Sequence, residues 1–122
     1  MSKTAITTLN DIAQTIYDKK GFNIIALDVR GISTMTDFYL IAEGNIDRHV
    51  KSLSQAIQYK MSELNQTLLH AEGLQTPDWV VMDYSDIVVH LFIPDLREKY
   101  ALEQLWKEAK IVDLHIDVKE EK

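Results

Sequence analysis

Two apolar runs that are separated by only two residues constrain the fold of this chain more than any other feature. Residues 79–84 (WVVMDY) and 87–93 (IVVHLFI) are rich in β-branched and aromatic side chains, and Ser85 and Asp86 between them suit a tight turn. The pattern predicts a β-hairpin with a two-residue turn. Cross-strand pairs of positions 84 with 87, 82 with 89, and 80 with 91 would give the hairpin one wholly apolar face.

The opposite face of this hairpin is mixed in character. Its members form three cross-strand pairs: Trp79 with Phe92, Val81 with His90, and Asp83 with Val88. Aromatic rings accompanied by a few charges are typical of protein-binding surfaces. The alternative is a second helical layer over this face, with the carboxylate and the imidazole hydrogen-bonded at its margin. Periodicity alone does not decide between the two.

Helical spacing of apolar residues predicts two helices before the hairpin. The first covers residues 5–17 and ends near Lys20. The second begins after Asn45, which we interpret as its N-cap, and runs to about Gln66. A third helix is expected to open at Pro94, with an apolar side formed by Leu102, Leu105, Trp106 and Ala109.

Short apolar runs at residues 23–29 and 37–43 predict two further strands, and residues 67–72 are a weaker candidate. The order helix, strand, strand, helix, strand, strand, strand, helix predicts an α/β (α+β) fold with a mixed five-stranded sheet and packed helices. Alternation of apolar and polar residues from 112 to 118 predicts an extended strap.

Length and composition bound the remaining choices. A chain of 122 residues fits a single domain over residues 1–122, with a core at about 5–110 and an extended or flexible tail at 111–122. The chain has no cysteine, which excludes disulfides and thiolate sites and favours a cytoplasmic location. It has no run of about 18 apolar residues, so we expect no membrane partner.

Charge indicates the kind of partner. The chain has 19 acidic and 13 basic residues and a net charge of −6, so it would repel bare nucleic acid and attract a basic protein surface. We therefore expect no direct, sequence-specific nucleic-acid binding. The same balance favours a factor that docks on the protein part of a ribonucleoprotein over one that binds its RNA.

A loop with several hydroxyl residues, from Gly31 to Thr36, raises the question of nucleotidyl transfer. That chemistry needs two carboxylates one residue apart on a strand, where both can hold a metal ion. Here Asp28 and Asp37 lie nine residues apart, and the loop hydroxyls fit a turn better than a phosphate site. Four scattered histidines form no local metal signature. We expect no catalytic residue, metal or cofactor, while an enzyme using Asp28, Asp37 and Ser33 stays open as an alternative.

Several sequence blocks, taken together and in order, resemble the RsfS (Iojap) family of ribosomal silencing factors. The blocks are IIALDVRGISTMTDFYLIAEG, DRHV, AEG, DWVVMDYSDIVVHLF and REKYALEQLW, and the resemblance covers roughly residues 5–110. Each block alone is weak, whereas their joint occurrence is highly specific. The resemblance implies a domain shaped like nucleotidyltransferases but not known for their catalysis, consistent with the missing carboxylate pair.

The resemblance also implies a function. Members of the family bind the large ribosomal subunit through ribosomal protein uL14 and sterically block subunit joining, which represses translation. Carried over by position, the residues that would face the partner are Trp79, Asp83 and Tyr100, supported by Arg97, Glu103 and His90, with Arg48 and His49 at the rim.

The sequence departs from the family pattern at two places that bear on this interpretation. Ser85 stands in the hairpin turn where a Gly is usual, and Glu43 adds a charge before the long helix, near Arg48. A dimerising adaptor, in which the mixed face of the hairpin is the self-interface of a homodimer, remains a further alternative.

Overall fold

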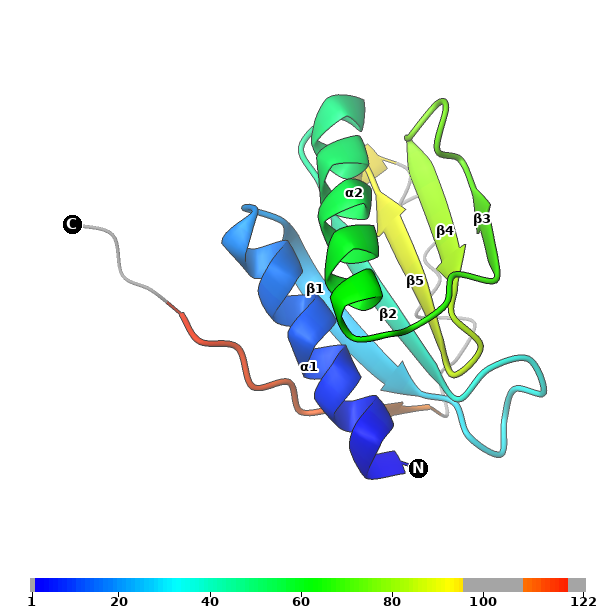
Figure 1. The fold of residues 1–122 in the computed structure, drawn as a ribbon. Helices are drawn as coiled ribbons and strands as arrows, with labels where there is room; N and C mark the ends of the chain where they lie inside the picture. Colours follow the sequence, from blue (N-terminus) through cyan, green and yellow to red (C-terminus); the bar gives the residue numbers. More distant parts are fainter. Residues whose placement is uncertain (1, 96–108, 119–122) are drawn as a thin grey trace.

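A mixed sheet with helices on one face forms the part of the chain that the computed structural model describes, residues 2–95 and 109–118 (Figure 1). The helices in these residues are α1 (Ser2–Asp18) and α2 (Asp47–Glu63). The strands are β1 (Phe22–Asp28), β2 (Phe38–Glu43), β3 (His70–Glu72), β4 (Trp79–Asp83), β5 (Ile87–Phe92) and β6 (Lys110–Ile111). Neither described helix has the length and apolar character needed to cross a membrane.

The strand order in the sheet is β3-β4-β5-β2-β1-β6. β2 and β5 run parallel, and every other neighbouring pair is antiparallel. The predicted α+β fold with a mixed sheet is confirmed, although the sheet has six strands and not five. The additional strand, β6, has only two residues, which is too short for an alternating pattern to reveal. The third helix predicted from Pro94 falls largely on residues 96–108, outside the described part.

The hairpin of β4 and β5 has the predicted register. Val80 pairs with Leu91 and Met82 with Val89, and the Tyr84 N–H donates to the Ile87 carbonyl at 2.9 Å. The turn residue Ser85 has a φ of 79°, a left-handed conformation that a side chain tolerates less well than glycine does. The two-residue turn therefore forms despite the departure from the usual glycine.

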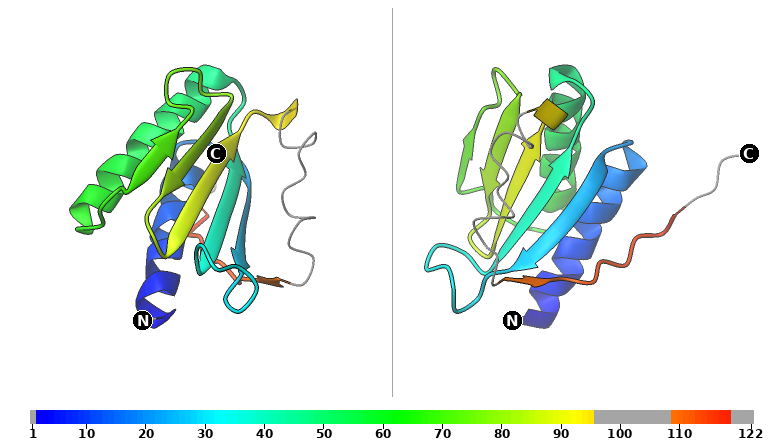
Figure 2. Two further views of the ribbon diagram at one scale, coloured as in Figure 1. Left: turned by 90° about the vertical axis from the view of Figure 1, so that its right-hand side faces the viewer. Right: turned by 180° about the vertical axis from the view of Figure 1, so that it is seen from behind.

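The main core lies between the helices and the sheet, and Figure 2 shows both helices on the same side of the strands. Each helix buries one apolar stripe at intervals of three and four residues, as the sequence predicted. The fully buried residues of these stripes are Leu9, Ile12, Ile16, Val50, Leu53, Ile57 and Met61. The predicted apolar face of the hairpin packs against them, because all six of its residues belong to the same cluster.

The start of α2 differs from the prediction. Its N-cap is Ile46, which makes no side-chain capping bond, and Asn45 therefore does not cap the helix. Instead the Asn45 backbone N–H donates to Nδ1 of His49 at 2.9 Å, and Nε2 of the same ring lies 2.8 Å from the Lys19 carbonyl. Because Nδ1 accepts a hydrogen bond, Nε2 is the ring nitrogen that can donate to the Lys19 carbonyl. His49 thus joins the end of α1 to the start of α2. The far end of α2 is at Glu63, three residues before the predicted Gln66.

The segment between β1 and β2 is a structural turn, as its hydroxyl residues predicted. Ser33 Oγ accepts from the Met35 N–H at 3.0 Å, and the buried Thr36 hydroxyl donates to the Ser85 carbonyl at 2.9 Å. The second of these bonds links the β1–β2 loop to the turn of the hairpin. These hydroxyl groups are therefore used by the backbone of the protein itself.

Candidate functional site

The sheet face that points away from the helices carries a group of aromatic side chains, Tyr39, Trp79, His90 and Phe92, which we call the outer cluster. The Trp79 and Phe92 rings stack with centroids 5.0 Å apart, and the Tyr39 and His90 centroids are 5.4 Å apart. The strands explain this grouping, because β2 lies beside β5 and β5 beside β4, so outward-facing positions of three strands meet. Phe92 is fully buried beneath its neighbours.

A hydrogen bond fixes the orientation of the tryptophan. Trp79 Nε1–H donates to Nδ1 of His90 at 3.2 Å. Burial lowers the pKa of His90 to about 4, which keeps the ring neutral and able to accept this bond at neutral pH. The predicted residues Trp79 and His90 are thus in direct contact, and each restricts the movement of the other.

Tyr39 joins the outer cluster although the sequence interpretation did not select it. Burial raises the pKa of Tyr39. A hydrogen bond from the Ser33 side chain to the Tyr39 oxygen opposes this rise, and the charge of Asp83 adds to it. The signal was present in the alternation of β2, where Phe38 and Leu40 face the core and Tyr39 faces outward. Only the pairing of β2 with β5, which local sequence does not reveal, places Tyr39 beside His90.

The remaining predicted site residues have different surroundings. Asp83 lies on the same outward side of β4 as Trp79, near the turn, and its Oδ1 accepts from the Ser85 N–H at 2.8 Å. Arg48 is exposed in the first turn of α2, beside His49, and both belong to the helical layer. The other three predicted residues, Arg97, Tyr100 and Glu103, lie outside the described residues.

Asp28, one of the two carboxylates considered for nucleotidyl transfer, is engaged within the chain itself. Asp28 forms a two-point contact with Arg30, whose Nε and Nη2 atoms lie 3.0 and 2.7 Å from its two oxygens. The hydrogen bond from Arg30 lowers the pKa of Asp28, with burial acting in the opposite direction. Among the described residues no three acidic or histidine side chains come together as a metal site would require.

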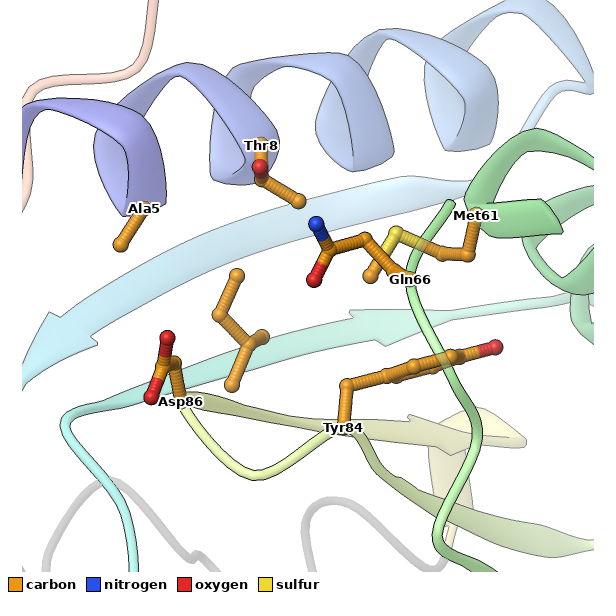
Figure 3. Close-up of a pocket in the computed structure, with 7 residues that line it drawn as sticks. Ala5, Thr8, Met61, Gln66, Tyr84 and Asp86 are labelled. Atoms are coloured by element: carbon orange, nitrogen blue, oxygen red, sulfur yellow. The ribbon is translucent and has the colours of Figure 1, made fainter. Parts of the chain in front are cut away.

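A cavity of 140 Å³ lies on the opposite side of the sheet, between α1, α2 and the hairpin turn. Figure 3 shows Gln66 projecting into it, between Thr8 of α1 and the strand residues below. The Tyr84 hydroxyl nearby is buried and has no hydrogen-bond partner among the described residues. The cavity is smaller than the roughly 300 Å³ at which small-molecule pockets usually begin. The outer cluster, in which aromatic rings lie beside a carboxylate, has the composition typical of protein-binding surfaces, and we take it as the candidate functional site.

Comparisons with known proteins agree on one group of relatives. A family model described as "Ribosomal silencing factor during starvation" matches residues 2–122. A Bacillus subtilis protein named ribosomal silencing factor RsfS is 39% identical over 97 residues, which span 80% of this chain and 82% of that protein. A mouse protein named for mitochondrial assembly of the ribosomal large subunit is 31% identical over 58% of this chain and 32% of its own length.

Solved structures give the same picture of the fold. A crystal structure of a Chromobacterium violaceum protein superimposes with a TM-score of 0.80 at 32% identity and covers 88% of each chain. A second structure, from Bacillus halodurans, has a TM-score of 0.74 at 34% identity and covers 84% of this chain and 93% of its own.

Proposed function

The chain belongs to the RsfS family of ribosomal silencing factors, and on that premise we propose that it binds the large ribosomal subunit through ribosomal protein uL14 and sterically blocks joining of the small subunit. Translation is repressed as a result. The proposed action takes place on ribosomes in the cytoplasm and involves no chemical turnover, because a bound domain needs only to occupy the surface that the other subunit approaches.

The observation that carries this proposal is the outer cluster. Trp79 is partly exposed and is held in place by its stacking on Phe92 and its bond to His90. A ring that is already oriented loses little conformational freedom on binding, so its contact area contributes more to affinity. Asp83, on the same side of β4, adds a carboxylate beside these rings. The described part of the predicted partner-facing set therefore has the composition of a protein-binding surface.

Charge supports a basic protein partner. The chain carries a net charge of −6, which attracts a surface rich in lysine and arginine and repels ribosomal RNA. The mouse relative, whose name refers to the ribosomal large subunit, supports the choice of that subunit over the small one. The enzyme alternative is disfavoured, since Asp28 and Ser33 are engaged within the fold.

The test replaces Trp79 by Ala and measures binding to purified large subunits by co-sedimentation. Loss of a desolvated aromatic anchor of about 2 kcal/mol should weaken binding by about 30-fold. Tyr59→Ala is the matched control, because Tyr59 is an aromatic residue on α2 with 69% of its surface exposed, and it should bind as the unmodified chain does.

A second measurement examines the blocking step itself. Light scattering of mixed large and small subunits should show less association when the chain is added in excess, and W79A should restore association. If the subunits associate equally well with and without the unmodified chain, steric blocking is wrong. If the chain blocks association and W79A blocks it equally well, the outer cluster is not the binding surface.

A further inference from the structure

Residues 109–117, which we call the clip, cross from one face of the sheet to the other at its β1 edge. Ala109 packs against the cluster of Leu27, Val29, Ile41 and Phe92 on the outer face, the same cluster that Trp79 packs against. Lys110 and Ile111 then join the sheet as β6, antiparallel to β1. Beyond them Val112 and Leu114 pack against the main core on the helix side. Figure 1 shows this segment leaving the β1 edge and passing beside α1.

Two amide side chains of α1 hold the far end of the clip. Asn10 Oδ1 accepts from the His115 N–H at 2.6 Å. Gln14 Oε1 accepts from the Asp117 N–H at 2.6 Å, and Gln14 Nε2 donates to the Asp117 carbonyl at 3.1 Å. All three bonds go to backbone atoms of the clip, and the Val112 N–H adds a fourth, to the Ala26 carbonyl at 2.9 Å.

Hydrogen bonds within α1 also orient the two amides. Asn10 Nδ2 donates to the Ile6 carbonyl at 3.0 Å, and Gln14 Nε2 donates to the Asp18 carboxylate at 2.9 Å. Because a carbonyl and an ionised carboxylate only accept, each amide must turn its NH₂ group toward its helical partner. Both amide oxygens are thereby directed at the N–H groups of the clip.

The spacing of the two elements also matches. Asn10 and Gln14 are four residues apart, a rise of about 6 Å along a helix. His115 and Asp117 are two residues apart, a rise of about 6.6 Å along an extended chain. Two helix positions four residues apart therefore lie opposite two clip positions two residues apart. In the clip, the apolar residues Val112, Leu114 and Ile116 are less exposed than the polar residues that alternate with them.

We propose that the clip positions the outer cluster for partner binding, and that Asn10 and Gln14 are positioning residues for that surface. The clip is anchored on α1, on the helix side of the sheet, and this anchor holds Ala109 against the outer face. Ala109 thereby supports the cluster on which Trp79 packs. The inference rests on the proposed function, because it assigns these two residues a role in binding the large subunit although neither belongs to the outer cluster.

The first experiment compares the full chain with the double variant Asn10→Ala and Gln14→Ala. Affinity for purified large subunits should fall about tenfold, the size expected when two or three hydrogen bonds that hold the clip are lost. Gln55→Ala is the matched control, since Gln55 is an exposed glutamine on α2. Thermal unfolding of every variant is recorded alongside.

A second variant separates positioning from general destabilisation. The chain has no cysteine, so the double variant Asn10→Cys and His115→Cys introduces a single candidate disulfide. These positions are chosen because the Asn10 side chain contacts the backbone of His115. Oxidation fixes the clip and should give the affinity of the unmodified chain. Reduction of the same sample removes only the Asn10 bond and leaves the two bonds from Gln14 to Asp117, so its affinity should lie between those of the unmodified chain and the alanine variant. A purely structural role would not produce a change in affinity that follows the redox state at a constant fold.

The outcomes are distinguishable. If the alanine variant and both redox forms bind as the unmodified chain does, while W79A loses binding, the positioning role is wrong and the proposed function stands. If W79A also retains full binding, the proposed surface itself is wrong. If the alanine variant fails to fold, equal affinity of the oxidised and reduced disulfide forms still overturns the inference.

Discussion

His90 illustrates how a single buried side chain determines the chemistry of the outer cluster. A charged imidazole could not accept the indole N–H of Trp79, and burial removes that charge by lowering the pKa of His90 to about 4. The sequence placed His90 on the mixed face of the hairpin. Its protonation state could not be predicted, because it depends on the rings of Tyr39 and Phe92 that surround it in the fold.

Acid should destabilise the protein through His90. The folded-state pKa of about 4 lies below the ordinary value of 6.5, so the unfolded chain binds more protons between these pH values. The free energy of unfolding should therefore fall as the pH drops from 6.5 to about 4, by at most about 3 kcal/mol. Urea denaturation at several pH values measures it.

The variant His90→Asn should flatten this pH dependence, since its amide oxygen replaces Nδ1 as an acceptor and does not titrate in this range. His70→Asn is the control, because the His70 side chain is 62% exposed and lies outside the outer cluster. An unchanged slope in the His90 variant would show that other groups cause the acid sensitivity.

At the scale of elements, the described helices and the hairpin follow from the local pattern of apolar residues, whereas the contacts that connect one element to another do not. Apolar spacing predicted α1 and α2, which each bury one face, and runs of β-branched and aromatic residues predicted β4 and β5. The predicted start of α2 was wrong. Asn45 does not cap the helix with its side chain, and its backbone N–H donates to His49 instead. Likewise β6 exists only because residues 110–111 meet β1, a contact that two residues cannot encode.

The hydrogen bond between the β1–β2 loop and the hairpin turn is a contact of this kind whose contribution to stability can be measured. Thr36→Val keeps the shape of the buried side chain but removes its bond to the Ser85 carbonyl, and should lower the free energy of unfolding by about 1 kcal/mol. Thr34→Val, at an exposed position in the same loop, should change it by less than about 0.5 kcal/mol. Equal effects in chemical denaturation would mean that the Thr36 bond contributes no stability.

At the scale of the whole molecule, charge and topology act together. The resemblance and the sheet class were available from the sequence, but the outer cluster required three strands in the order β4-β5-β2. Its fourth ring, Tyr39, lies 40 to 53 residues before the others in the chain, and only the parallel pairing of β2 with β5 brings it there. The positions predicted for Arg97, Tyr100 and Glu103 stay predictions, because they fall outside the described residues.

Net charge makes a prediction about binding kinetics. With a net charge of −6 and a basic partner, the association rate with large subunits should fall as the salt concentration rises from 50 to 200 mM, while the dissociation rate changes less. Stopped-flow or surface-based kinetics would measure both rates. An association rate that is insensitive to salt, or that rises with it, would contradict attraction to a basic surface.

The parallel pairing of β2 with β5 has a consequence for how the chain is made. The two strands are neighbours at the centre of the sheet, yet α2, β3 and β4 are translated between them. During synthesis one edge of β2 stays unpaired until residue 92 has emerged, and an open edge of this kind is where strands from other chains attach. The nascent protein is thus most exposed to aggregation before its last central strand appears, and early arrest of its own translation would leave that edge uncovered.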